Sequence, residues 1–189
     1  MRFASGFSLF PPPALRPPIP NRYPESMAIH SQQRQMLNEG AQAPELNFET
    51  LAGGTTTMAE IRAKGPALLA FYKISCPTCQ LTFPYLERLS KNKNFQVIGI
   101  CQDEPAGAVE FNKVFHIHFP ILLDTEQSGY AAGNAFGISH VPSLFVVEPD
   151  GKISVAEQGF TKPLLEELGE RAGITVFTDA DTVPLYKPG

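Results

Sequence analysis

The chain has 189 residues, of which 43% are hydrophobic, and a formal net charge of −4. This length suits one well-cored domain with tails, and the absence of any block of Lys or Arg gives no basic surface for nucleic acid or an anionic membrane. Three cysteines are too few for a disulfide scaffold, and no apolar run approaches the ~20 residues that span a bilayer. We therefore expect a globular protein that binds neither nucleic acid nor membrane.

Residues 1–39 are predicted to form a disordered, proline-rich arm. Seven prolines lie within residues 1–26, and no sustained periodicity favours a helix or a core there. A short apolar stretch near the start runs straight into Pro11, unlike a secretory signal. We expect a cytoplasmic protein, with organelle import or a misassigned start for residues 1–26 as the alternatives.

Residues 40–173 alternate between strand-like and helix-like patterns, which predicts an α/β domain built on crossover units. Residues 67–73 (ALLAFYK) form a short apolar run typical of a buried central strand. Residues 76–91 then place apolar side chains four apart from Leu81 to Leu89, which predicts a helix.

The remaining elements follow in chain order. Their predicted bounds are a strand at 95–101, a helix at 104–115, a strand at 120–123, a short helix at 126–134, strands at 143–147 and 152–158, and a helix at 161–171. Thr161 is expected to cap the last helix, and the Pro-Asp-Gly sequence at 149–151 suits a tight hairpin turn. Residues 174–189 are predicted to be a loose tail.

The candidate reactive groups are Cys76 and Cys79, three residues apart in the sequence Cys-Pro-Thr-Cys. Cys76 falls between the central strand and its helix, and Pro77 takes the first helical position, where its missing N–H costs nothing. Unpaired N–H groups and the positive end of the helix dipole favour the thiolate of Cys76. Cys79 lies one turn further on the same face, within disulfide reach but deeper. We predict that Cys76 attacks and Cys79 resolves.

These residues resemble the thioredoxin-like thiol-disulfide oxidoreductases, in particular the TlpA/ResA-like and AhpC/TSA-related (redoxin) branch. The matching features are the strand before Cys-Pro-Thr-Cys, Pro84 five residues past Cys79, and FGISHVPSLFVVEPDGKI at 136–153. The resemblance implies a central mixed β-sheet flanked by helices, with a family-type N-terminal hairpin and a central insertion. It also implies a cis-proline at Pro142 that faces the thiols, with Val141 and His140 beside it as substrate-binding residues.

The chain departs from the family pattern at several positions. It has no tryptophan, Ser75 precedes the first cysteine, and Ala70 replaces the buried acid of ordinary thioredoxins. The active-site glutamate of ResA-like members corresponds to Thr82, so Thr82 and Lys73 are the candidates for proton transfer near Cys79. The peroxiredoxin signature before the reactive cysteine is also absent.

The predicted function is thiol-disulfide exchange with protein substrates through Cys76 and Cys79. The expected partners are protein disulfides or dithiols and a reductant such as a thioredoxin system, with no cofactor, no bound metal, and a monomeric or weakly dimeric state. A hydroperoxide reductase of peroxiredoxin type is the alternative within enzymes. Outside enzymes, the alternatives are a redox-inactive thioredoxin-like module or a copper site made of both cysteines and His140, since this soft ligand set would suit Cu(I). Cys101 ends an apolar strand and is interpreted as a core residue.

Overall fold

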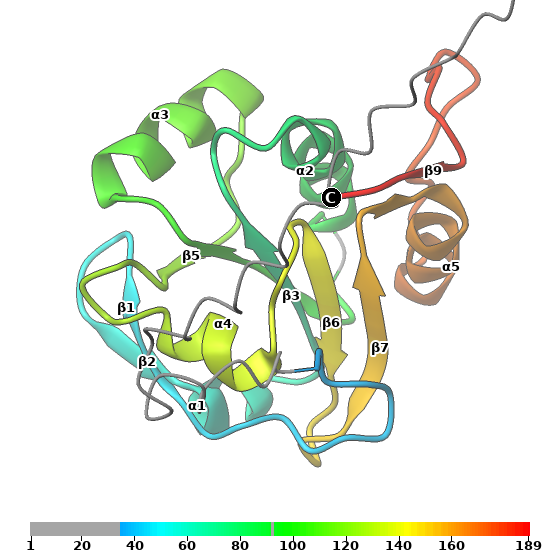
Figure 1. Ribbon diagram of the computed structural model, residues 1–189. Helices are drawn as coiled ribbons and strands as arrows, with labels where there is room; N and C mark the ends of the chain where they lie inside the picture. Colours follow the sequence, from blue (N-terminus) through cyan, green and yellow to red (C-terminus); the bar gives the residue numbers. More distant parts are fainter. Residues whose placement is uncertain (1–34, 92) are drawn as a thin grey trace, which may run out of the picture. The chain divides into compact units, whose positions relative to one another are not determined.

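The computed structural model describes residues 35–91 and 93–189 (Figure 1). A seven-stranded sheet has the strand order β2-β1-β5-β4-β3-β6-β7. Its strands are β1 Asn47–Thr50, β2 Thr55–Thr57, β3 Ala67–Tyr72, β4 Gln96–Cys101, β5 Ile121–Leu123, β6 Ser143–Val147 and β7 Ile153–Gln158. β3, β4 and β5 run parallel, and every other neighbouring pair is antiparallel. The prediction of a mixed sheet with an N-terminal hairpin, here β1 and β2, is confirmed.

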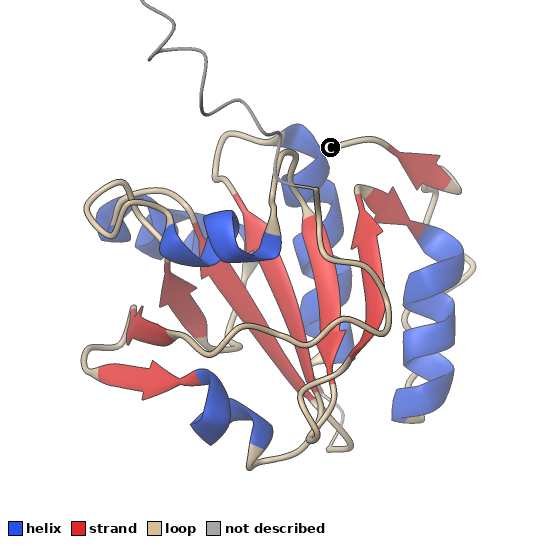
Figure 2. Ribbon diagram, turned by 60° about the horizontal axis from the view of Figure 1, so that its bottom comes forward, coloured by secondary structure: helices blue, strands red, loops and turns tan. Residues whose placement is uncertain are grey.

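Helices cover both faces of this sheet and make three layers (Figures 1 and 2). They are α1 Met58–Arg62, α2 Pro77–Leu89, α3 Pro105–Phe115, α4 Ala131–Phe136 and α5 Lys162–Ala172. Helices α2, α3 and α5 share one hydrophobic cluster with the sheet, whereas α1 and α4 pack into a second cluster on the other face. None of the helices in the described part of the chain is long and apolar enough to cross a bilayer.

The central strand β3 is buried over its whole length. Successive side chains of a strand point to opposite faces, so Leu68 and Tyr72 enter the cluster under α2, and Leu69 and Phe71 enter the cluster under α4. A strand with helices on both sides must be apolar on both sides, which explains the uninterrupted run ALLAFY. Packing thereby fixes the end of β3, from which the loop to α2 begins.

Most elements begin and end within two residues of their predicted bounds. These elements are β3, α2, β4, α3, β5, β6, β7 and α5. The hairpin turn between β6 and β7 also forms as expected. Glu148 N–H donates to the Lys152 carbonyl at 2.8 Å, and Gly151 adopts a φ of 86°, a conformation that glycine enters without a Cβ clash.

The short helix α4 starts later than predicted, at Ala131 instead of residue 126. Residues 126–130 form turns, and the carboxylate of Asp124 accepts the N–H groups of Ala132 and Gly133 at 2.9 and 2.8 Å. This buried carboxylate satisfies the free N–H groups of the helix start from outside the helix. The helix therefore begins where a tertiary contact supplies its cap.

The N-termini of two other helices differ from the predictions. Helix α1 was not predicted, although Thr57 and Glu60 form a reciprocal capping box that the spacing Thr-x-x-Glu signals. Thr161 does precede α5, but its hydroxyl makes no capping hydrogen bond. Thr161 thus occupies the predicted N-cap position of α5 without contributing a side-chain hydrogen bond to the helix start.

The two ends of the predicted domain differ from expectation in detail. The predicted disordered arm covers residues 1–39, and residues 1–34 of it lie outside the described part of the chain. The remaining part contacts the domain, since the Leu37 N–H donates to the Phe136 carbonyl at 3.0 Å. Residues 174–189 are not a loose tail. Val176 is buried, and the strand β9 Tyr186–Lys187 pairs with β8 Phe160–Thr161.

Candidate active site

Cys76 occupies the N-cap of α2, directly after the loop that leaves β3. Its Sγ accepts the N–H of Cys79 at 3.2 Å, and Pro77 follows at the first helical position. The Cys76 residue is half-buried. Free N–H groups and the helix dipole stabilise negative charge at this position. The local sequence thus places the Cys76 sulfur at the point of α2 that best supports a thiolate.

Cys79 lies one turn further along α2 and is fully buried. Burial raises the pKa of its thiol, the hydrogen bond to Cys76 raises it further, and a contact with the Lys73 backbone opposes both. The two thiols are therefore neighbours in very different surroundings. The sequence order predicted this placement, and the chemical roles of the two thiols stay predictions.

The loop before β6 approaches Cys76 from the other side. The peptide bond between Val141 and Pro142 is cis, and the Cys76 thiol donates to the Val141 carbonyl at 3.2 Å. Pro142 is buried, and its carbonyl accepts the N–H of Gly159 at 2.8 Å. The structure thus brings together Cys76, Val141 and Pro142 from segments 65 residues apart.

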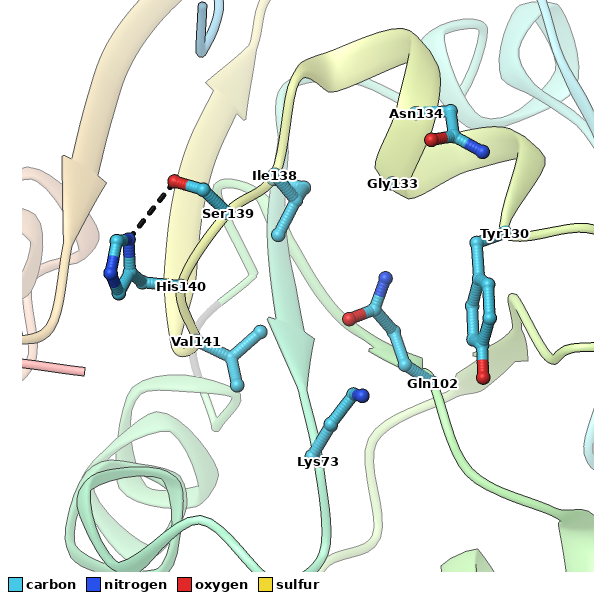
Figure 3. Close-up of a pocket in the computed structure, with 9 residues that line it drawn as sticks. All are labelled: Lys73, Gln102, Tyr130, Gly133, Asn134, Ile138, Ser139, His140 and Val141. Atoms are coloured by element: carbon cyan, nitrogen blue, oxygen red, sulfur yellow. Dashed lines mark hydrogen bonds between the residues drawn. The ribbon is translucent and has the colours of Figure 1, made fainter. Parts of the chain in front are cut away.

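A pocket of about 370 Å³ adjoins this loop. The lining of this pocket includes Lys73, Gln102, Tyr130 and Val141 (Figure 3). Of these residues, Val141 is the one that contacts Cys76. The Lys73 ammonium lies 5.8 Å from the centre of the Tyr130 ring. The pocket therefore offers a cation and an aromatic face next to the loop that contacts Cys76.

His140 is exposed and contributes to the wall of this pocket. Its Nδ1 lies 2.9 Å from the Ser139 hydroxyl, and Figure 3 shows the ring directed away from Lys73 and Gln102. Among the described residues, no group of three or more His, Cys, Asp or Glu side chains could hold a metal ion. The copper alternative, which requires His140 beside both cysteines, gains no support from this geometry.

The two proton-transfer candidates are both engaged away from the thiols. Thr82 is buried, and its hydroxyl donates to the Thr78 carbonyl at 2.7 Å, one turn earlier in α2. The Lys73 side chain is directed to Tyr130, and its carbonyl accepts the N–H of Cys76 at 3.2 Å. Lys73 therefore supports the loop through its backbone.

Sequence reasoning missed Asp103, which follows β4. Its carboxylate accepts the N–H of Ile74 at 2.6 Å, and the Gln80 side chain donates to the Ile74 carbonyl at 2.9 Å. The Ile74 residue of the reactive loop is thus held from both sides. The Asp103 charge also adds to the effect of burial in raising the pKa of Cys79. The available signal was the parallel pairing of β3 and β4, since the carboxyl ends of parallel strands lie at the same edge.

Cys101 lies in the core behind the reactive pair. It is fully buried at the end of β4, opposite Tyr72 of β3, and burial raises the pKa of its thiol. The buried Tyr72 hydroxyl interacts with this thiol and partly offsets the effect of burial on its pKa. Burial agrees with the interpretation of Cys101 as a core residue.

Comparisons with known proteins agree with this geometry. The family model described as AhpC/TSA family matches residues 40–156, more than half of the chain. The chain is 29% identical over 142 residues to the thiol-disulfide oxidoreductase ResA of Halalkalibacterium halodurans, covering 72% of this chain and 78% of the relative. The ResA protein of Bacillus subtilis is 27% identical over 124 residues, covering 64% of this chain and 67% of the relative.

A solved structure supports the same fold. The thioredoxin domain of a thiol-disulfide oxidoreductase from Bacteroides vulgatus superimposes with a TM-score of 0.64 at 20% identity, covering 72% of this chain and 99% of that domain. The predicted resemblance and the predicted fold are both confirmed. The chain belongs to the AhpC/TSA family and is an oxidoreductase of thioredoxin-like fold.

Proposed function

We propose that this protein exchanges disulfides with protein substrates through Cys76 and Cys79. One observation carries the proposal: the half-buried Cys76 at the start of α2 touches the Val141 carbonyl through its sulfur, with a fully buried Cys79 one turn behind it. The names of the ResA relatives describe the same class of reaction for those proteins.

The reaction has two exchange steps. The Cys76 thiolate attacks one sulfur of a substrate disulfide, the substrate S–S bond breaks, and the departing substrate thiolate takes up a proton. Cys79 then loses its proton and attacks the Cys76 sulfur, which releases the second substrate thiolate. Two electrons pass from the protein to the substrate, and an intramolecular Cys76–Cys79 disulfide remains. An external dithiol reductant, such as a thioredoxin system, returns the pair to the reduced state.

The backbone around Val141 is the proposed docking point for the substrate chain. An extended peptide can add to exposed backbone groups as a strand would, while neighbouring pockets select its side chains. The pocket that contains Lys73 and Tyr130 would take a substrate side chain next to the reacting cysteine. We assign His140 to the rim of this docking point. A monomer or weak dimer in the cytoplasm is the proposed setting.

The test compares two reactions of the purified protein. We expect it to accelerate the reduction of insulin disulfides by dithiothreitol more than it accelerates the consumption of hydrogen peroxide. Negligible insulin reduction together with rapid peroxide consumption would favour the peroxidase alternative and refute the proposal. Both rates should be measured for Cys76→Ser, which shows whether either reaction uses this thiol.

A further inference from the structure

The last described residues of the chain return to the reactive thiols. β9 pairs with β8 in a register that sets Lys187 opposite Phe160, and the next residue, Pro188, reaches the start of α2 (Figure 1). There the Thr78 hydroxyl donates to the Pro188 carbonyl at 2.7 Å. Thr78 lies between Cys76 and Cys79, so this segment touches the Cys-Pro-Thr-Cys sequence itself.

Gly189 lies against the backbone of Val141. A Cβ atom at Gly189 would come within 2.4 Å of the Val141 carbonyl oxygen and 3.2 Å of its nitrogen. The same carbonyl oxygen accepts the Cys76 thiol. The segment therefore covers the backbone groups on which a substrate chain would dock.

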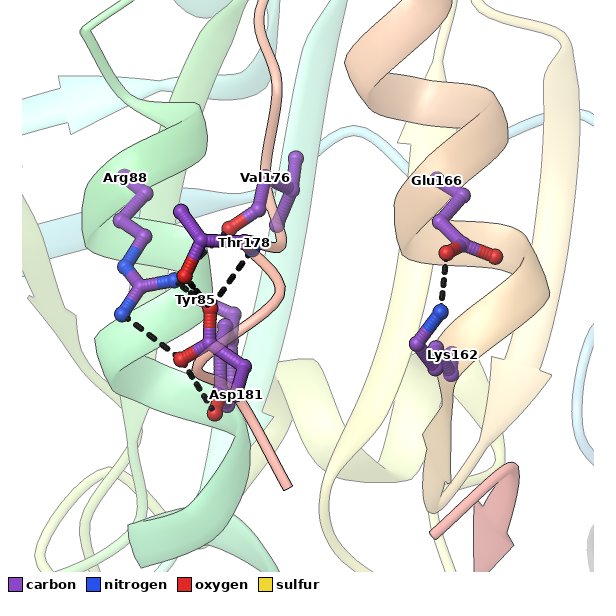
Figure 4. Close-up of polar contacts among 7 residues, drawn as sticks. All are labelled: Tyr85, Arg88, Lys162, Glu166, Val176, Thr178 and Asp181. Atoms are coloured by element: carbon purple, nitrogen blue, oxygen red, sulfur yellow. Dashed lines mark hydrogen bonds and ion pairs between the residues drawn. The ribbon is translucent and has the colours of Figure 1, made fainter. Parts of the chain in front are cut away.

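An anchor upstream holds this segment to α2 (Figure 4). Arg88 donates to both carboxylate oxygens of Asp181 at 2.6 and 2.9 Å and to the Val176 carbonyl at 3.0 Å. The rings of Phe177 and Tyr85 pack with centroids 4.6 Å apart. This arrangement fixes the chain up to Asp181 independently of the contacts at the thiols.

The residues beyond the anchor are held much less firmly. None of residues 182–189 is buried, and the side chains of Leu185 and Tyr186 are 70% and 55% exposed. Their contacts include a two-residue strand pair, hydrogen bonds to the Leu185 and Pro188 carbonyls, and the packing of Val183 against the core. Among residues 182–189, Val183 alone is a hydrophobic side chain packed against the core cluster, and it lies outside the segment 184–189.

We propose that residues 184–189 form a strap that competes with protein substrates for the Val141 backbone and must move before a substrate disulfide reaches Cys76. The inference rests on the proposed function, because it concerns access to the same thiol. Only one chain can occupy a backbone docking position at a time. The observed rate of attack on a substrate disulfide is then proportional to the fraction of molecules in which the strap is undocked.

Gly189→Val tests the strap, because a larger side chain at this position cannot share space with the Val141 backbone. We expect kcat/KM for insulin disulfides to rise about fivefold, as the open fraction increases. The alkylation of Cys76 by iodoacetamide should also accelerate. The matched control is Leu185→Ala, whose exposed side chain is lost while its carbonyl still accepts the Lys162 N–H, and it should react like the parent.

Equal insulin reduction by the parent and Gly189→Val would overturn the strap, and so would slower reduction by Gly189→Val. The melting temperatures of both variants, compared with the parent, show that the fold is intact. The proposed function fails separately: it fails if Cys76→Ser reduces insulin as fast as the parent, whatever the behaviour of Gly189→Val.

Discussion

Cys76 and Cys79 are the same residue type one turn apart in α2, and their surroundings are nearly opposite. Cys76 is half-buried, accepts a backbone N–H and donates to the Val141 carbonyl. Cys79 is fully buried, and burial raises the pKa of its thiol. A helix that begins at the surface and runs into the core gives two nearby thiols different exposure and acidity. This difference is the physical basis for an attacking and a resolving cysteine.

The largest expected effect comes from removing the Cys76 thiol. Cys76→Ser should lower insulin reduction by about a hundredfold or more, because a hydroxyl cannot replace a thiolate as the nucleophile in disulfide exchange. Serine is a good N-cap residue, so the start of α2 should persist. Circular dichroism provides the control for folding. Substantial residual turnover would assign the attack to another cysteine.

Removing the buried thiol should stop turnover at an intermediate. Cys79→Ser keeps the attacking thiol but cannot release the product by intramolecular exchange, so mixed disulfides through Cys76 should accumulate. A non-reducing gel followed by mass spectrometry identifies the trapped partner. The double variant, in which Cys76 is also serine, is the matched control and should trap nothing. Equal trapping by Cys76→Ser would contradict the division of roles.

The raised pKa of Cys79 predicts a pH dependence for the second step. The thiolate fraction grows as the pH rises toward a raised pKa, so release of the second substrate thiol should accelerate about tenfold per pH unit between pH 6 and pH 9. Single-turnover reduction of a model disulfide at several pH values measures this rate. A rate that does not change with pH would show that loss of the Cys79 proton does not limit resolution.

Asp103→Asn tests the same difference in thiol pKa between Cys76 and Cys79, with a smaller expected effect on the rate. An asparagine oxygen can still accept the Ile74 N–H, while the negative charge that raises the pKa of Cys79 is lost. The pKa of Cys79 should fall, and resolution at pH 7 should accelerate by a factor of about three. Glu104→Gln, which removes an exposed neighbouring charge, is the control and should leave the pH profile unchanged. An identical profile in Asp103→Asn and the parent would exclude this influence of Asp103.

The smallest effect on activity is expected at the third cysteine. Cys101→Ala removes a buried sulfur far from solvent, so insulin reduction should stay within about twofold of the parent, while the free energy of unfolding falls by about 1 kcal/mol. Urea titration measures the stability. A complete loss of turnover in Cys101→Ala would make Cys101 the resolving thiol and would favour a peroxidase-like cycle.

The sequence by itself determined the features that depend on near neighbours. Three local features are enough to place one thiol at a helix start and a second thiol one turn inside: the apolar run of β3, the position of Pro77 and the three-residue spacing of the cysteines. The turn at Gly151 follows from the same local rules, since it needs only a residue that tolerates positive φ. Periodicity and turn chemistry act over a few residues, so a single chain reveals them.

Tertiary structure alone decided which distant groups meet these thiols. Three separate segments supply these groups: the Val141 carbonyl contacts Cys76, the Pro188 carbonyl contacts Thr78, and the Asp103 carboxylate holds Ile74 in the loop before α2. The late start of α4 has the same origin, because Asp124 supplies its cap across a turn. Such contacts depend on how the sheet orders its strands and on how the last segment packs against α2. Local sequence patterns carry no information on these distances, because the partners are brought together only when both faces of the sheet have buried their apolar side chains.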